Sequence, residues 1–472
     1  MKGIAFLLLL LLPACSGDGQ SPPSLGPPAG ASQPAAVSPV DLSTADLAAL
    51  VTWEDLLLSV RGEATPEGVR LLRAMEGRPE YAPFLFDLAF LPTPYREEAL
   101  PLLFGRGGVY GAQNFLRFAE ERGFKKPEDD PPGYVEFKQR LFSTIQKEMG
   151  AFLDPKAPRL IAAQEVMWGG VAVDGIPPLN DPRFVTPGEA ARWINPSDQV
   201  IGVEINGDAR AYPRRIIDWH EMVNDTVGGV PVSLAYCTLC GSAILYDGRA
   251  GGTVYRFGTS GMLYRSNKLM YDRNTRTLWE QYTGEPVWGP LAGSGIKLDF
   301  LPVVHTTYEG WLRDHPDTKV LDINTGFRRD YGPGVAYADY WASGDLIFPA
   351  PDRDPALLRK DWVYAVRLHG EAVAYPIALL AERSVIHDTI GPTAVVVIAT
   401  EDRSGGRAYE SNGRRFRLEA PDLLRAGDGS AWRITEAALV SDDGSELRRL
   451  PGHNSFWFAV TNHAPRWRLY GE

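Results

Sequence analysis

One segment of the sequence occurs twice, and this repeat constrains the fold more than any other feature. Residues 201–213 (IGVEINGDARAYP) are echoed by residues 364–376 (YAVRLHGEAVAYP), and residues 224–228 (NDTVG) by residues 387–391 (HDTIG). The spacing is 163 residues in both places, although the loops between such segments readily accept insertions. The constant spacing predicts one β-rich unit that is folded twice, with the two copies packed together.

The two copies differ in their reactive residues. The second copy keeps the glycine, proline and apolar positions that fold the unit, so the residues it lacks are not needed for folding. These are His220, Glu221, Cys237 and Cys240, which become Arg383, Ser384, Thr400 and Arg403 at the same spacing. We therefore expect a functional first copy and a structural second copy.

The local pattern places the reactive residues close together. Pro213 suits the start of a helix, and the apolar spacing over residues 214–225 predicts that this helix continues to Asp225, with His220 and Asn224 on one face. Residues 230–237 alternate as a strand, so Cys237 lies at the strand's end. Gly241 then permits a sharp turn that brings Cys240 beside Cys237.

Three hypotheses fit this C-T-L-C-G segment. In the first, Cys237, Cys240 and His220 bind a soft metal, copper or zinc, with a carboxylate, water or substrate at the fourth position and Glu221 as a further catalytic candidate. In the second, the cysteines are a metal-free redox dithiol, as in a thiol–disulfide oxidoreductase, with His220 relaying a proton. In the third, they form a structural disulfide in a surface interaction protein. Whether the protein is an enzyme is left open.

A polar and aromatic segment follows and is a candidate pocket wall facing the cysteines. Its predicted substrate contacts are Asn267, Tyr271, Asp272 and Gln281, with Met270 as a possible soft ligand; the alternative is a buried structural network with a core methionine. His305 is a weaker candidate. Surface or structural positions are expected for His315, His369, His387, His453 and His463. No phosphate loop or dinucleotide fingerprint is present, so no nucleotide cofactor is expected.

Several motifs together resemble a known family. They are Arg210-Ala211-Tyr212-Pro213, Trp219-His220-Glu221, the Tyr236–Ser242 segment, Leu269–Arg273 and Gly289-Pro290. This run, from about Gly170 to Tyr340, resembles the bacterial domain-of-unknown-function family numbered 3179. Thr238 stands where that family usually has proline, and Tyr308 where it often has tryptophan. The resemblance implies exported or lipid-anchored proteins with this cysteine motif, and it implies no established reaction.

The first residues predict export. Lys2 precedes an apolar run from Ile4 to Leu12, which is far shorter than the roughly 20 residues needed to span a bilayer. Leu12-Pro13-Ala14-Cys15 resembles a lipobox, so Cys15 is the predicted lipidation site after a signal peptide of residues 1–15. Residues 16–42, rich in Pro, Gly, Ser and Ala, predict a flexible tether. We expect an extracytoplasmic lipoprotein that is attached to the membrane, its predicted partner, through this anchor.

The remaining sequence predicts an α+β protein. Apolar residues at three- and four-residue spacing over 43–155 indicate a small helical bundle or solenoid, a possible surface for a protein partner. The β-rich copies follow at 160–345 and 346–472. A net charge of −11, with no basic run, argues against nucleic-acid binding.

Overall fold

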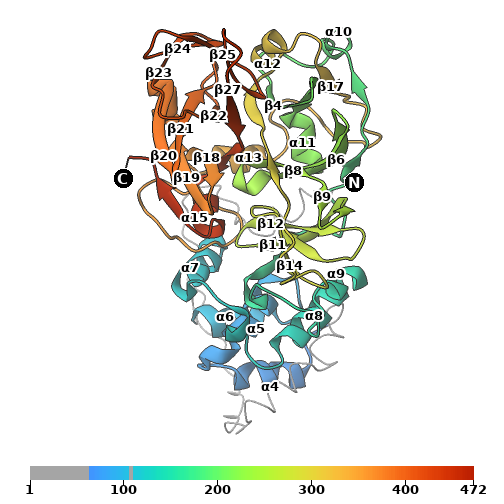
Figure 1. The fold of residues 1–472 in the computed structure, drawn as a ribbon. Coiled ribbons are helices and arrows are strands. Elements are labelled where there is room, and N and C mark those ends of the chain that lie inside the picture. The colour runs from blue at the N-terminus through green and yellow to red at the C-terminus, as the bar shows by residue number, and fades with distance from the viewer. Residues whose placement is uncertain (1–62, 106–109, 472) are drawn as a thin grey trace, which may run out of the picture. The chain divides into compact units, whose positions relative to one another are not determined.

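The computed structural model describes residues 63–105 and 110–471. The predicted signal peptide, Cys15 and the tether lie outside these residues. Within the described part of the chain, no helix is both long enough and apolar enough to cross a membrane. The protein is a mixed α+β chain that divides into two compact units (Figure 1). We call residues 63–105, 110–117 and 128–155 the helical unit, and residues 118–127 and 156–471 the β-rich unit.

Short helices build the helical unit. They are α4 (Pro66–Ala74), η2 (Pro79–Tyr81), α5 (Ala82–Phe90), α6 (Arg96–Phe104), α8 (Tyr134–Ile145) and α9 (Lys147–Ala151). Two further helices, α7 (Ala112–Arg122) and η3 (Pro127–Asp129), each have residues in both units. Thr65 caps α4 by accepting a hydrogen bond from the Gly68 amide, and Pro66 suits the first helical position. In the core, Lys138 forms a buried ion pair with Asp87 at 3.1 Å.

Three five-stranded sheets form the first half of the β-rich unit, residues 156–345. The first holds β16 (Val304–Thr307), β4 (Gln199–Ile205), β5 (Asp208–Pro213), β17 (Lys319–Leu321) and β3 (Phe184–Val185). The second holds β15 (Phe300–Leu301), β8 (Ser242–Asp247), β7 (Val230–Cys237), β6 (Met222–Val227) and β2 (Leu179–Asn180). The third holds β1 (Val166–Trp168), β11 (Phe257–Tyr264), β12 (Asn267–Asp272), β13 (Leu278–Glu280) and β14 (Glu285–Trp288).

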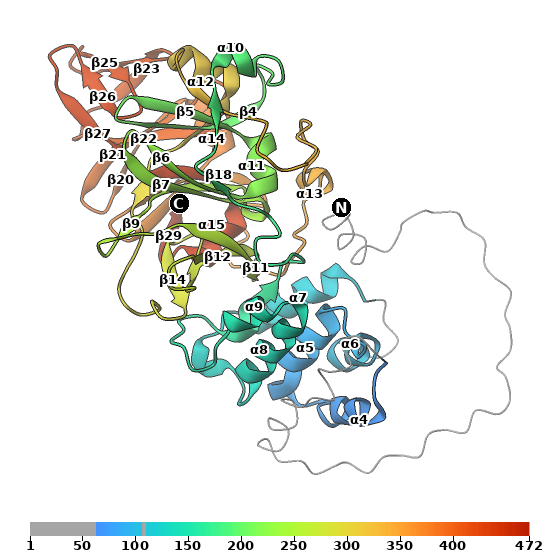
Figure 2. The same ribbon diagram turned by 90° about the vertical axis from the view of Figure 1, so that its right-hand side faces the viewer.

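Shorter elements complete this half. They are η4 (Ala163–Glu165), α10 (Pro187–Ala190), α11 (Arg214–His220), η5 (Thr238–Cys240), the hairpin β9 (Arg249–Ala250) and β10 (Thr253–Val254), α12 (Tyr308–Asp314) and α13 (Ala338–Ala342). Ile216 and Ile217 of α11 join an apolar core to which strands of the first two sheets also contribute. Figure 2 shows α11 beside these strands. Val232, Leu234 and Tyr236 of β7 lie in the same core, so the alternate side chains point away from it.

The second half, residues 346–471, has two sheets. The smaller holds β28 (Gly452–Phe456), β18 (Trp362–Leu368), β19 (Glu371–Pro376) and β29 (Trp467–Leu469). The larger holds β20 (Val385–Ile390), β21 (Thr393–Ala399), β22 (Gly406–Glu410), β27 (Glu446–Leu450), β26 (Ala438–Ser441), β25 (Ala431–Ile434), β24 (Leu423–Ala426) and β23 (Phe416–Ala420). Its helices are α14 (Ile377–Arg383) and α15 (Trp457–His463).

Four consecutive elements have the same bounds in both halves when 163 residues are added. These pairs are β4 and β18, β5 and β19, α11 and α14, and β6 and β20. A buried hydrogen bond recurs with them, because Tyr212 donates to Asp225 and Tyr375 to Asp388, both at 2.8 Å. The two halves therefore share the order and length of these elements.

One local prediction is wrong. The helix that begins at Arg214 ends at His220, and Asn224 lies on β6 rather than on a helical face shared with His220. The helix stops because Glu221 adopts a left-handed backbone conformation, with φ of 54°, while its amide still donates to Ile217 O at 2.8 Å. Ser384 does the same after α14, with φ of 61° and a 2.8 Å bond to Leu380 O. The apolar spacing beyond His220 therefore belongs to a buried strand.

Candidate functional site

The two cysteines lie against each other at the end of β7. Both are free thiols, and Cys237 Sγ donates to Cys240 Sγ at 3.1 Å. Cys240 Sγ in turn donates to Ser266 O at 3.4 Å and accepts from Asn267 Nδ2 at 3.1 Å. Their side chains are almost wholly buried, with 1% and 0% of their surface exposed. Burial, followed by the hydrogen bond and charge of Cys237, raises the pKa of Cys240 well above that of a free thiol.

The turn that joins the cysteines depends on Gly241. This residue has φ of +61°, and a Cβ there would lie 2.5 Å from the ring of Trp362. Trp362 belongs to β18, so the second half of the β-rich unit packs directly on the cysteine turn. Gly241 is thus required both by the backbone conformation and by the close approach of the tryptophan.

An acid–base cluster adjoins Cys237. Lys268 Nζ donates to Glu221 O at 2.5 Å and Tyr236 O at 3.3 Å, and lies 3.8 Å from the Glu221 carboxylate. That carboxylate accepts hydrogen bonds from Thr238 at 3.1 Å and Tyr337 at 3.2 Å. Burial raises the pKa of Glu221, and the positive charge of Lys268 opposes that rise. Burial also lowers the pKa of Lys268, against the negative charges of Glu221 and Cys237.

Glu221 is therefore placed beside the cysteine turn, as the sequence predicts, but Lys268 and Tyr337 were not singled out. One sequence signal points to Lys268, because a lysine inside a buried strand needs a partner for its charge. All of β12, including Lys268, is buried. Tyr337 comes from a loop more than 100 residues away, and no local pattern connects it to Glu221.

His220 is bonded away from the thiols. One ring nitrogen lies 2.7 Å from Pro177 O, and the other lies 2.7 Å from the hydroxyl of Tyr331. Burial lowers the pKa of His220 to about 4, so the imidazole is neutral at pH 7. Among the described residues, no group of three or more His, Cys, Asp or Glu side chains is placed to hold a metal ion.

One of the four predicted contact residues, Asn267, bonds a cysteine directly, and a second, Gln281, bonds Asn267. Asn267 bonds Cys240 and also donates to Gln281 Oε1 at 2.8 Å, and Gln281 donates to Ala235 O at 2.9 Å. Tyr271 instead donates to Asp174 at 2.8 Å, and Asp272 accepts from Trp279 Nε1 at 2.9 Å. The structure thus places Asn267 at the thiols with Gln281 behind it, whereas Tyr271 and Asp272 have other partners. Met270 is fully buried in β12.

One segment, residues 325–343, runs across the site, and we call it the tyrosine strap. Three of its hydroxyls bond the site: Tyr331 to His220, Tyr337 to Glu221, and Tyr340 to Leu239 O at 2.6 Å. Tyr337 takes a left-handed conformation with φ of 57°, which is costly for a tyrosine and directs its ring inward. The strap explains how a turn near the end of a strand becomes fully buried.

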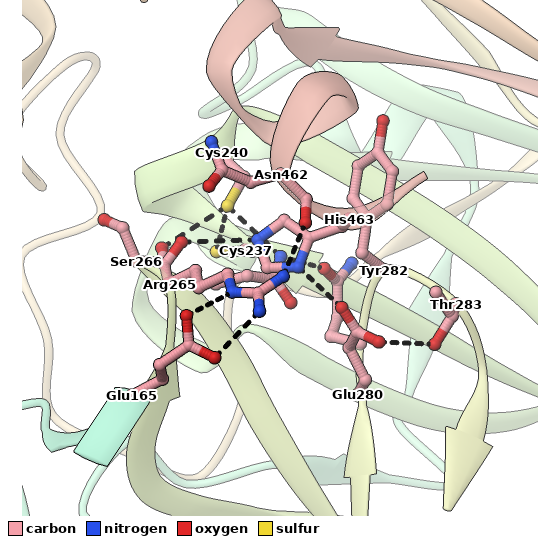
Figure 3. A network of polar contacts seen from close by, with 12 residues as sticks. Glu165, Cys237, Cys240, Arg265, Ser266, Glu280, Tyr282, Thr283, Asn462 and His463 are labelled. Carbon is pink, nitrogen blue, oxygen red and sulfur yellow. Dashed lines mark hydrogen bonds and ion pairs between the residues drawn. The ribbon is translucent and has the colours of Figure 1, made fainter. Parts of the chain in front are cut away.

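A second polar network reaches Cys240 from the other half (Figure 3). His463 of α15 bonds Glu280 at 2.5 Å through one ring nitrogen, and its other ring nitrogen lies 3.3 Å from Arg265 O. Arg265 pairs with Glu165 at 2.7 Å. Arg265 and Ser266 both have positive φ, 47° and 61°, so the turn whose carbonyl accepts from Cys240 is held by these contacts. His463 and His453 are buried, with 5% and 4% exposure, rather than on the surface.

A family model of proteins of unknown function, DUF3179, matches residues 173–466. The chain belongs to this family. The match covers most of both halves of the β-rich unit and so extends beyond the motifs of residues 170–340. No curated protein matches the chain. No solved structure matches it either. Membership of DUF3179 specifies no reaction, so only the residues of the site indicate the chemistry.

Proposed function

We propose that Cys237 and Cys240 form a redox-active dithiol that cycles with its disulfide. The observation that carries this proposal is the direct 3.1 Å contact between the two sulfur atoms. A disulfide bond of about 2.05 Å requires the sulfurs to approach by only about 1 Å more. The three-residue spacing of the cysteines and the turn that ends at Gly241 already hold the two side chains together. Oxidation therefore does not require distant elements to move.

The oxidant in this proposal is a small disulfide compound. The Cys237 thiolate attacks one sulfur of that compound, which forms a mixed disulfide and releases the other sulfur as a thiol after protonation. The Cys240 thiolate then attacks Cys237 Sγ and releases the second thiol. The protein gives up two electrons and two protons, and the disulfide compound becomes two thiols.

The surroundings assign different roles to the two cysteines. Cys237 interacts electrostatically with the buried Lys268, and its thiol donates only to the other cysteine and not to a backbone carbonyl, so we assign it the attacking role. Cys240 donates to Ser266 O, and burial raises its pKa, so we assign it the second, resolving step. Because both sulfurs are buried, this chemistry requires the tyrosine strap to open to admit the disulfide compound.

The alternative, a copper or zinc site on Cys237, Cys240 and His220, stays a prediction. It requires His220 to give up one of its two hydrogen bonds, to Pro177 O or to Tyr331, and to turn toward the thiols. The dithiol needs no such rearrangement, and this difference is why we favour it.

The proposal includes the setting of the site. The matching bounds of four elements and the recurring Tyr–Asp hydrogen bond support a duplicated unit in which only the first copy carries chemistry. We place the protein outside the cytoplasm, anchored through Cys15, with the helical unit as a surface for a protein partner. An oxidising compartment suits a dithiol that must be reoxidised.

The test uses the full chain with Cys15→Ser, so that Cys237 and Cys240 are the only thiols. The protein is equilibrated with reduced and oxidised glutathione at a series of ratios, alkylated under denaturing conditions and weighed by mass spectrometry. We expect both thiols to be lost together and recovered on reduction without unfolding. In a Cys240→Ser variant, we expect a glutathione adduct trapped on Cys237.

Other outcomes separate the alternatives. Two thiols that stay reduced at every glutathione ratio, without bound metal, contradict the dithiol proposal. A disulfide that is reduced only after unfolding identifies a structural bond. Stoichiometric copper or zinc in the same sample, lost in Cys237→Ser and in His220→Gln, establishes the metal site instead.

A further inference from the structure

Arg367 of β18 is a half-buried cation without a carboxylate partner among the described residues. One of its terminal nitrogens, Nη1, donates to Tyr282 O. Its other terminal nitrogen, Nη2, and its Nε are both buried and have no hydrogen-bond partner. The guanidinium lies over the rings of Tyr282, at 4.0 Å, and Phe300, at 4.9 Å. A buried guanidinium normally pairs with an anion, because removing its charge from water is costly unless it is compensated.

The guanidinium borders a small cavity at the seam between the two halves of the β-rich unit. Strands β8 and β15 of the first half supply walls such as Ile244 and Phe300, and Arg367, Gly452 and His453 close it from the second half. The Nε2 atom of His453 is also buried without a partner. Two side chains from neighbouring strands that line this cavity therefore carry buried nitrogen atoms without a hydrogen-bond partner.

The cavity volume limits the ligand. Its volume is about 10 Å³, which is the space of roughly one water molecule. Carboxylates, phosphates and sulfates are too large for it. A monoatomic anion fits the space with slight adjustment of the walls, and it also supplies the negative charge that Arg367 lacks.

We propose that this cavity is a binding site for a halide-sized anion, held by Arg367 Nε and Nη2 and by the Nε2–H of His453. The site is separate from the cysteine pair and does not depend on the dithiol proposal. Burial, and then the positive charge of Arg367, holds the pKa of His453 well below its usual value, so the imidazole is neutral and able to donate.

The first experiment measures thermal stability of the full chain in sodium chloride and in sodium gluconate at matched ionic strength. Gluconate controls for general salt effects because it is too large for the cavity. We expect the Tm of the wild type to be higher in chloride than in gluconate by about 2–4 °C, since the folded state binds the anion. Arg367→Met should abolish that difference.

A matched variant shows whether the loss is specific. Arg407 is more deeply buried than Arg367 and is paired with Glu436 at 2.7 Å, so Arg407→Met also removes a guanidinium from the interior. We expect Arg407→Met to lower the Tm in both salts and to keep the chloride response. If Arg367→Met fails to fold, His453→Phe tests the same site, and it should weaken the response.

The second experiment locates the anion directly. Crystals of the wild type in sodium bromide should show an anomalous scattering peak in the cavity, beside Arg367 and His453. A peak there, together with the chloride-specific Tm shift, supports the proposal. Ordered water in the cavity with no anomalous peak, or equal Tm values in chloride and gluconate, overturns it.

Discussion

Each cysteine sulfur has a defined hydrogen-bond partner. Cys237 donates to Cys240, and Cys240 donates to a backbone carbonyl and accepts from Asn267. On oxidation both thiol hydrogens are lost, so Ser266 O loses its donor. That carbonyl belongs to a turn of two positive-φ residues, which makes it the atom whose environment changes most when the disulfide forms.

Lys268 is the residue whose loss should be most damaging outside the cysteines. Its Nζ joins Glu221 O and Tyr236 O, and it compensates the buried Glu221 carboxylate. Lys268→Met should lower the free energy of unfolding by about 3 kcal/mol, because it leaves a buried acid without its cation. Chemical denaturation measures this. Lys297→Met, which removes an exposed pair with Glu285, should cost less than about 1 kcal/mol. Equal effects of the two substitutions would contradict the role assigned to Lys268.

His220 should make stability depend on pH. Its pKa in the folded protein is about 4, below the 6.5 of a free imidazole, so between these values the unfolded chain binds a proton that the folded chain does not. Its contribution is complete above pH 6.5 and is lost as the pH falls to 4, by roughly 3 kcal/mol. Denaturation at pH 7 and pH 4.5 should show a smaller loss for His220→Gln than for the wild type. The exposed His369→Gln controls for removal of an imidazole, and a loss in His220→Gln as large as in the wild type would refute this prediction.

Residue identities were predictable from the sequence only where the repeat exposed them. The comparison of copies singled out Glu221 and the cysteines because it shows which positions the frame does not need. The comparison does not identify Lys268, Tyr337 or His463, because they come from a hairpin, a loop and the far half of the chain. Their proximity depends on tertiary packing, which local spacing does not encode.

At the scale of elements, the turn of η5 and the strand β18 act as one structure, since Trp362 fills the space beside Gly241. Gly241→Ala adds both backbone strain and a clash with the ring. Gly207→Ala, with φ of +78° and no atom within 4 Å of the added Cβ, adds the strain alone. We expect Gly241→Ala to cost about 1–3 kcal/mol more than Gly207→Ala in the free energy of unfolding. Equal costs would mean that Trp362 moves aside freely.

Element types were easier to predict than element ends. The strand predicted at residues 230–237 coincides with β7, because alternating apolar residues specify a strand. The helix after Pro213 stops earlier than its apolar spacing indicates, since Val223 is buried in β6 rather than on a helix. A short apolar run satisfies either periodicity, and the left-handed Glu221 decides between them.

The whole molecule should unfold in two steps, because each unit has its own core. Calorimetry of the wild type should therefore resolve two transitions. Lys138→Met, which breaks the buried pair with Asp87, should lower the temperature of one transition, and Lys268→Met should lower the other. A single transition that both substitutions shift equally would show that the units unfold together.

The recurrence of α11 as α14 provides a comparison within a single molecule. The amides of Glu221 and Ser384 each donate at 2.8 Å to the carbonyl oxygen four residues earlier in the preceding helix, and both residues have a positive φ. Glu221 carries a buried carboxylate beside Lys268, whereas Ser384 carries a hydroxyl group at the corresponding position. Hydrogen exchange at these two amides, recorded in one sample, gives two local opening free energies whose difference measures what the reactive surroundings cost in rigidity. The unreactive half thus serves as a built-in reference for the trade-off between stability and chemistry.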